Sequence, residues 1–282
     1  MLVGCTTSGE ETYIAVTIEP QRYFAEKIAG DRFRIHTVVP DGQSPETYDP
    51  TPQQMVALSK SYAYLRIGHL GFEQAWMQRI KDNNPRMQIF DLSEGFALIT
   101  EEEEEEEEQE EQGLHHHHHH PGGVDPHIWS SVNGARTLAG NTLKALITLD
   151  KDNEDFYRRN YAGLMAEIDQ TEAIIRRKLS ALTSRTFIIY HPALTYFARE
   201  FELSQLCIER DGKEPSPAQL KELVDKAKAY RAEVVFVQQE FDVKNAERIA
   251  EETACRLVSV NLLNYYWSNE LIEIAKALAN ES

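Results

Sequence analysis

The sequence predicts an α/β protein of two lobes, each built on a parallel sheet, joined by one long rigid helix. Short runs rich in Val, Ile, Phe and Tyr alternate with amphipathic runs, both before and after a central acidic tract. Such alternation is typical of parallel sheets with crossover helices. Apolar residues then recur at helical spacing over 153–182, which predicts a helix about 45 Å long at about 1.5 Å per residue. Because one small lobe needs no helix of that length, we expect it to tie two lobes together.

The first half of the chain is expected to form one sheet with its crossover helices. Thr51 can cap one of these helices, and Pro52 fits its first turn. Strands are predicted at 13–18, 33–40, 63–69 and 87–93, with helices at 20–29, 51–59 and 72–83.

The second half is expected to form the helical spine and the other sheet. The continuous run "VVFV" suits a strand that is covered on both faces. Helices are predicted at 128–149, 153–182, 193–201, 217–230, 244–253 and 267–279, and strands at 186–191, 203–209, 233–239 and 256–261. The expected organisation is an anchor and tether at 1–12, an N-terminal lobe at 13–149 that includes an acidic and His-rich loop at 100–123, a connecting helix at 150–184, and a C-terminal lobe at 185–282.

Composition excludes some classes of function. The 282 residues carry a formal net charge of −17, of which the glutamates of the acidic tract contribute ten, leaving about −7 for the rest. An acidic chain does not suit nucleic-acid binding, which needs a basic stripe to displace counterions. No stretch approaches the roughly 20 apolar residues of a membrane-spanning helix.

The N-terminus resembles the lipobox that precedes a lipid-modified cysteine in bacterial lipoproteins. "MLVGC" ends at Cys5 and is followed by the polar run "TTSGEE". Only four residues precede Cys5, so either a signal peptide has been trimmed or the match is accidental; the polar run favours trimming. We expect Cys5 to carry a lipid anchor in the bacterial envelope. In that oxidising compartment Cys207 and Cys255 could form a disulfide, and two buried thiols are the alternative.

Three potential metal ligands lie where ligands bind in parallel sheets, beyond the carboxyl ends of the strands. His69 and His191 end predicted strands, and Glu46 lies in a loop after another. A fourth candidate, His127, follows Asp125, which we expect to cap a helix that starts at the next residue, a proline. The positive end of that helix would disfavour the imidazolium and keep His127 neutral, as metal binding requires.

Three imidazoles and a carboxylate form a plausible closed site for Zn²⁺ or a similar divalent ion. A single histidine at a strand end is more often an ordinary polar residue, so the shared placement carries the argument. The motifs of zinc proteases, serine hydrolases and phosphate-binding loops are absent from the sequence. A two-lobed metalloenzyme, a hydrolase or chelatase, remains the alternative, but catalytic zinc needs an open position for water and four protein ligands would close it.

Six phrases carry a resemblance to a known family. They are "SPETYDPTP", "IGHLGFE", "DPHIW", "YHPALTYFAREF", "EPSPAQL" and "AERIAEETACRLVSVNLL", in that order along nearly the whole chain. The sequence resembles the metal-binding solute-binding proteins of bacterial zinc and manganese ABC importers. The resemblance implies two α/β lobes joined by one long helix, with a metal site in the cleft between them. It also implies a monomeric, non-enzymatic protein that captures Zn²⁺, or Mn²⁺, in the periplasm and delivers it to an ABC-type permease.

Within this resemblance, His127 and His191 fall on family metal ligands. Two positions depart from the pattern: Glu46 stands where the family usually has His, and Asn261 stands where an acidic ligand often opens an Asp-Pro-Leu phrase. An amide is a poor ligand for Zn²⁺, so we do not expect Asn261 to bind it. His69 could restore the missing imidazole. The expected ligands are Glu46, His69, His127 and His191.

A run of six histidines follows the acidic tract in the middle of the chain, where a purification tag would not be placed. A loop of this kind before Asp-Pro-His is typical of the zinc-specific branch of the family. We expect an auxiliary, low-affinity metal loop close to the cleft; a merely solvated charge run is the alternative. Its histidines are His115, His116, His117, His118, His119 and His120.

Overall fold

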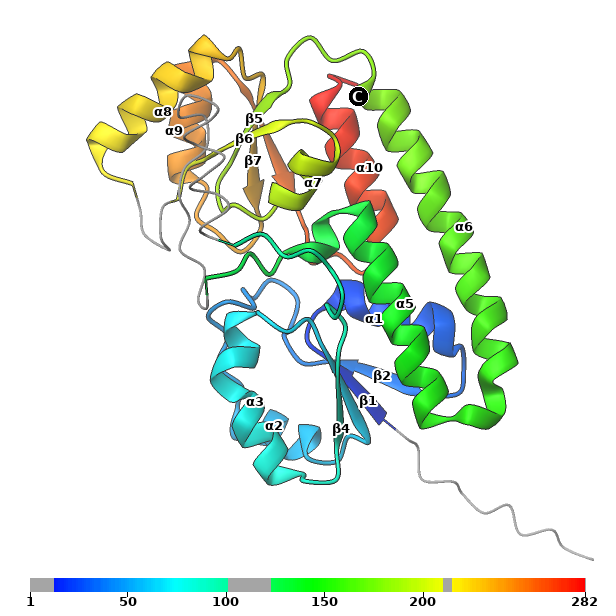
Figure 1. Cartoon of the computed structure of the whole chain (residues 1–282). Coiled ribbons are helices and arrows are strands. Elements are labelled where there is room, and N and C mark those ends of the chain that lie inside the picture. Colours follow the sequence, from blue (N-terminus) through cyan, green and yellow to red (C-terminus); the bar gives the residue numbers. More distant parts are fainter. Residues whose placement is uncertain (1–12, 101–122, 210–214, 282) are drawn as a thin grey trace, which may run out of the picture.

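The protein has two parallel sheets of four strands each, in a computed structural model that describes residues 13–100, 123–209 and 215–281. The strand orders are β2-β1-β3-β4 and β6-β5-β7-β8. Figure 1 shows the two sheets in separate lobes, with the long helix α6 (Glu154–Leu179) running beside both. The predicted fold class is confirmed.

In the first sheet, the first strand of the described chain, β1, is an inner strand with β2 on one side and β3 on the other. Thr51 caps α2 by accepting a hydrogen bond from the backbone N–H of Gln54, as its position in the sequence predicts. The elements are β1 (Tyr13–Val16), α1 (Glu19–Ala29), β2 (Arg34–Thr37), α2 (Pro52–Leu58), β3 (Ala63–Arg66), α3 (Gly71–Asn83) and β4 (Gln88–Asp91).

The second sheet repeats the same order of connections. Its inner strands β5 and β7 are buried along their whole length, as expected for strands with helices on both faces. The elements are β5 (Thr186–Ile189), α7 (Thr195–Glu200), β6 (Ser204–Cys207), α8 (Pro217–Ala229), β7 (Val234–Gln238), α9 (Lys244–Thr253), β8 (Arg256–Val260) and α10 (Trp267–Leu278).

The helix expected at 128–149 is interrupted near its start. A short 3₁₀ turn, Ile128–Ser130, precedes α5 (Val132–Leu149), and Ser131 between them has an extended backbone. The Ser131 hydroxyl caps α5 by accepting from the N–H of Gly134, 3.0 Å away. A side chain at Gly134 would overlap the carbonyl oxygen of Ile128, so the interruption depends on this glycine.

Helix α6 is the spine of the molecule, preceded by a 3₁₀ turn at Lys151–Asn153. Its 26 residues span about 39 Å at about 1.5 Å per residue. Its buried side chains belong to one apolar cluster that also contains Ile14 of the first sheet and Phe187 of the second. Because this core is continuous along α6, the helix packs against both lobes rather than linking them as a free tether.

Two smaller expectations can be compared with the structure. Cys207 and Cys255 are both buried, and no disulfide joins them in the part of the chain that is described. Within the same residues, no helix combines the length and the apolar character needed to cross a membrane.

Candidate metal centre

A small cavity lies where the ends of strands and loops from both lobes meet. Glu46 lines it from the first lobe, and His191 and Glu240 line it from the second, with His127 between them. Its volume is about 30 Å³, roughly that of one water molecule. Space of this size is sufficient for a small ion.

His127 is fixed by Asp125, two residues before it in the chain. An Asp125 carboxylate oxygen lies 2.8 Å from the His127 backbone nitrogen and 2.8 Å from its Nδ1. Both side chains are buried, with His127 4% exposed and Asp125 1% exposed. An ionised carboxylate only accepts hydrogen bonds, so Nδ1 carries the proton and Nε2 is the nitrogen that can bind a metal.

The prediction that Asp125 caps a helix was wrong, so His127 does not lie at the helix end that was expected to keep it neutral. The 3₁₀ turn starts at Ile128, and Asp125 accepts from His127 instead of capping a longer helix. Burial lowers the pKa of His127, but the charge and hydrogen bond of Asp125, together with the charges of Glu46 and Glu209, outweigh it. The pKa of His127 is therefore raised. A proton consequently competes with a metal ion for this ring up to a higher pH than it would for an ordinary histidine.

His191 follows β5 and is held on three sides. Its Nδ1 lies 2.9 Å from a carboxylate oxygen of the buried Glu209. Gln238 at the end of β7 binds the His191 backbone twice: it accepts from the N–H at 3.2 Å and donates to the carbonyl at 2.7 Å. Phe241 stacks on the imidazole, with ring centroids 5.2 Å apart. The ring is thereby oriented before any ion arrives.

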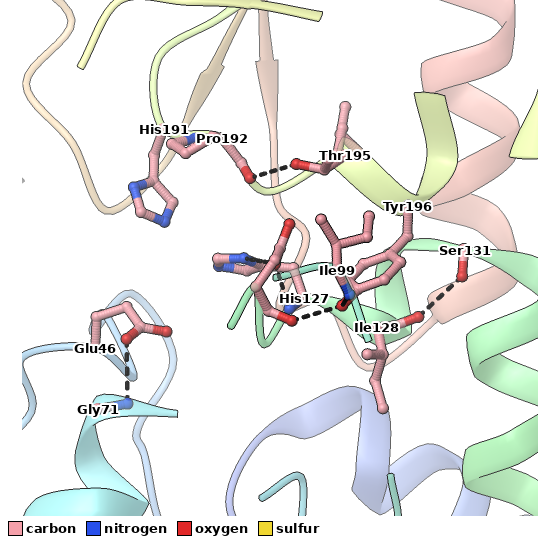
Figure 2. A network of polar contacts seen from close by, with 12 residues as sticks. Glu46, Gly71, Ile99, His127, Ile128, Ser131, His191, Pro192, Thr195 and Tyr196 are labelled. Carbon is pink, nitrogen blue, oxygen red and sulfur yellow. Dashed lines mark hydrogen bonds and ion pairs between the residues drawn. The ribbon is translucent and has the colours of Figure 1, made fainter. Parts of the chain in front are cut away.

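The two imidazoles lie edge to face beside each other at the cavity. The ring centroids of His127 and His191 are 5.1 Å apart and the ring planes meet at 70°. Each ring places Nδ1 against a carboxylate, which is the arrangement that orients metal-binding histidines in proteins. Figure 2 shows both rings and the Glu46 side chain extending toward the same space.

Glu46 is held at the cavity by the start of α3. Its Oε2 accepts from the backbone N–H of Gly71 at 3.1 Å, and the N–H of Phe72 donates to the Pro45 carbonyl at 2.9 Å. A side chain at residue 71 would overlap the Glu46 carbonyl oxygen, so this close approach requires glycine. The Oε1 atom of Glu46 is buried and accepts no hydrogen bond from the described residues.

The structure does not bring His69 to the cavity. The chain turns sharply after β3 at Gly68, whose φ is +114°, and His69 is not among the lining residues. The His69 carbonyl accepts from the Gln74 side chain, at the start of α3. Asn261 is likewise absent from the lining: its side-chain oxygen accepts from the backbone N–H of Leu263 at 3.0 Å and shapes a turn.

Glu240 is the lining residue that the sequence analysis missed. It lies two residues beyond the end of β7, at the same edge of the sheet as His191. Its place beyond the carboxyl end of a predicted strand is the signal in the sequence that points to it.

The donor groups face one cavity but are not yet gathered around one point. Among the described residues, no three side chains of His, Cys, Asp or Glu are already placed to hold a metal ion together. We expect a bound ion to draw them inward. Cys5 and the histidines at 115–120, which we predicted as anchor and auxiliary loop, lie outside the described residues.

Two parallel-sheet lobes, a shared helical spine and an ion-sized cavity with two carboxylate-oriented imidazoles define a metal-binding solute-binding protein. A family model described as "Zinc-uptake complex component A periplasmic" (ZnuA) matches residues 14–267. The chain therefore belongs to the ZnuA family, which confirms the resemblance. It is a transport component and not an enzyme, so the metalloenzyme alternative is not supported.

Individual relatives agree with this assignment. The chain is 26% identical to the high-affinity zinc uptake system protein ZnuA of Bacillus subtilis (strain 168), covering 91% of this chain and 80% of that protein. It is 24% identical to the manganese ABC transporter substrate-binding lipoprotein PsaA of Streptococcus anginosus, covering 89% and 82%. A crystal structure of a ZnuA protein superposes with a TM-score of 0.85 at 37% identity, covering 96% of this chain and 99% of that one.

Proposed function

We propose that this protein captures Zn²⁺ in the bacterial envelope and delivers it to an ABC-type permease, with Mn²⁺ as the second candidate cargo. Relatives named for zinc and for manganese uptake support both ions. The observation that carries the proposal is the pair His127 and His191, each with Nδ1 against a buried carboxylate, facing one ion-sized cavity. Imidazole is a preferred ligand of Zn²⁺.

In this proposal Glu46, His127 and His191 are protein ligands of the ion. Glu46 joins the set because its Oε1 is buried in the cavity region without a hydrogen-bond partner among the described residues. His69, which the sequence analysis included, is left out because it does not line the cavity.

The test of this function is metal binding by the purified protein. Metal analysis of protein purified without added metal identifies the cargo, and competition with a chromophoric chelator gives its affinity. We expect His127→Ala or His191→Ala to weaken tight binding at least tenfold, about 1.4 kcal/mol. The measurement is cleanest in protein that lacks residues 101–120, and unchanged affinity in both variants would rule out this site.

The setting of the protein is a separate part of the proposal. We propose that a monomer acts outside the cytoplasmic membrane, held there by a lipid on Cys5, with 13–149 and 185–282 as lobes and 150–184 as the connecting helix. The family description as periplasmic supports the location. Labelling with radioactive palmitate in cells, compared between the natural protein and Cys5→Ser, tests the anchor.

The histidines at 115–120 form the second part of the proposal. We propose that they collect metal weakly near the tight site. The ends of their segment lie beside the cavity residues: Thr100 pairs with Val124 in an antiparallel bridge, and the N–H of Asp125 donates to the Ile99 carbonyl at 3.0 Å. Ions held by the run would therefore be released close to His127.

A further inference from the structure

We propose that Glu240 is the fourth protein ligand of the cleft site, so that two imidazoles and two carboxylates hold the ion. This inference rests on the proposed function and adds a residue that neither the sequence motifs nor the family pattern indicates. It also explains how the chain forms a complete site with Asn261 at the position where an acidic ligand is expected.

The position of Glu240 places its carboxylate among the other donors. It lines the same cavity as Glu46, His127 and His191. Its neighbour Phe241 stacks on the His191 ring, so the segment that follows β7 is packed directly against one of the ligands. Electrostatic interactions with both imidazoles also act on the Glu240 carboxylate.

The surroundings of Glu240 lack the positive charge that a buried carboxylate needs. Its Oε2 atom is buried without a hydrogen-bond partner in the described part of the chain. No Lys or Arg is among the described residues that line the cavity. Burial raises the pKa of this group; a hydrogen bond from its own backbone N–H and the charges of the two imidazoles oppose the rise only in part, and Asp41 adds to it. Partial burial of a carboxylate with one oxygen unpaired is costly, and a bound dication would offset that cost.

The other candidates for a fourth ligand are excluded by their contacts. The side-chain oxygen of Asn261 already accepts from the Leu263 N–H, and an amide is a weak donor to Zn²⁺. His69 does not line the cavity. Asp125 and Glu209 each engage the Nδ1 of a histidine and act behind the ligands. Glu240 is the donor that remains on the lobe opposite Glu46.

A second carboxylate has consequences for the ion that is held. Carboxylate oxygens suit harder ions such as Mn²⁺ better than imidazoles do, and two carboxylates neutralise the charge of a dication. Glu46 and Glu240 come from different lobes, so an ion bound by both ties the lobes together. Removing the charge at Glu240 should therefore weaken Mn²⁺ binding more than Zn²⁺ binding.

The test compares Glu240→Gln with Glu251→Gln, a matched change at an exposed position on α9 in the same lobe. Affinities for Zn²⁺ and Mn²⁺ are measured by chelator competition, with circular dichroism to verify folding and His127→Ala as the reference for loss of the site. We expect Glu240→Gln to weaken Zn²⁺ binding at least tenfold and Mn²⁺ binding further, and Glu251→Gln to stay within twofold of the natural protein.

Two outcomes separate this inference from the proposed function. If His127→Ala loses tight binding while Glu240→Gln keeps it, the fourth ligand is not Glu240 and the function stands. If the natural protein binds neither ion tightly, the function itself is refuted. X-ray absorption of protein that lacks residues 101–120, loaded with one equivalent of zinc, provides a further check: two imidazoles with oxygen ligands support the inference, and three imidazoles overturn it.

Discussion

Replacing Asp125 with Asn tests whether the partner behind His127 prepares the site. The change keeps the size of the side chain and leaves an oxygen that can still accept from the His127 backbone and Nδ1, both now 2.8 Å away. It removes the negative charge that makes the imidazole a stronger base. Loss of such a partner typically costs 10–100-fold in metal affinity, roughly 1.4–2.7 kcal/mol. We therefore expect a loss in that range at pH 7.5.

The same substitution also predicts how the difference in metal affinity between the two proteins changes with pH. Burial lowers the pKa of His127, but Asp125 is the largest influence that raises it, and the net shift is upward. A raised pKa means that the proton competes with the metal up to a higher pH, so metal affinity of the natural protein falls steeply as the pH drops through that range. In Asp125→Asn the pKa falls, and competition begins only at a lower pH. The affinities of the two proteins should therefore converge as the solution is acidified.

The assay is chelator competition at several pH values between about 5.5 and 8, since an unperturbed imidazole titrates near 6.5. Asp152→Asn is the control, because Asp152 is exposed in the 3₁₀ turn before α6. It should match the natural protein at every pH. Equal affinities of Asp125→Asn and the natural protein at pH 7.5, or a gap that widens on acidification, would refute this account of His127.

Two further predictions concern the loop that carries Glu46 and the acidic and histidine run. Gly71→Ala should weaken tight metal binding at least tenfold, because the new side chain overlaps the Glu46 carbonyl oxygen and must displace the Glu46 loop. The control is Gly163→Ala in α6, where a new side chain meets no neighbour and metal affinity should not change. This control should also stabilise the protein by up to about 1 kcal/mol, as thermal unfolding would show. Deleting residues 101–120 should remove only weak Zn²⁺ binding in calorimetry, because Thr100 and Val124 already pair across the segment and three residues can close it. Loss of tight binding after that deletion would make the histidine run the primary site.

The parts of the fold that depend on local pattern could be predicted from the sequence. Helix α9 spans Lys244–Thr253, the range predicted, because both its apolar stripe and its ends are visible locally. The start of α5 was not predicted, because the interruption depends on the close approach of Gly134 to the Ile128 carbonyl. Such an approach is a property of the folded backbone and leaves no periodic signal.

The candidate site was predictable only in part, for a similar reason. Strand ends indicated Glu46 and His191 correctly as lining residues, but the turn at Gly68 keeps His69 away from the cavity. The partner of His191 could not be predicted, because Glu209 follows β6 and the two residues meet only when β5 and β6 pair. Pairing of neighbouring strands thus decides which polar residues orient the ligands.

With the proposed ligand set, the charge balance of the cavity favours one kind of ion. Each imidazole already has a carboxylate at Nδ1, so the histidines offer Glu46 and Glu240 little net positive charge. The buried oxygens of these two glutamates, Oε1 and Oε2, lack hydrogen-bond donors among the described residues. A dication would balance the charges of both carboxylates, whereas a monovalent cation would balance only one of them. The cavity therefore suits a small dication that accepts nitrogen and oxygen ligands together.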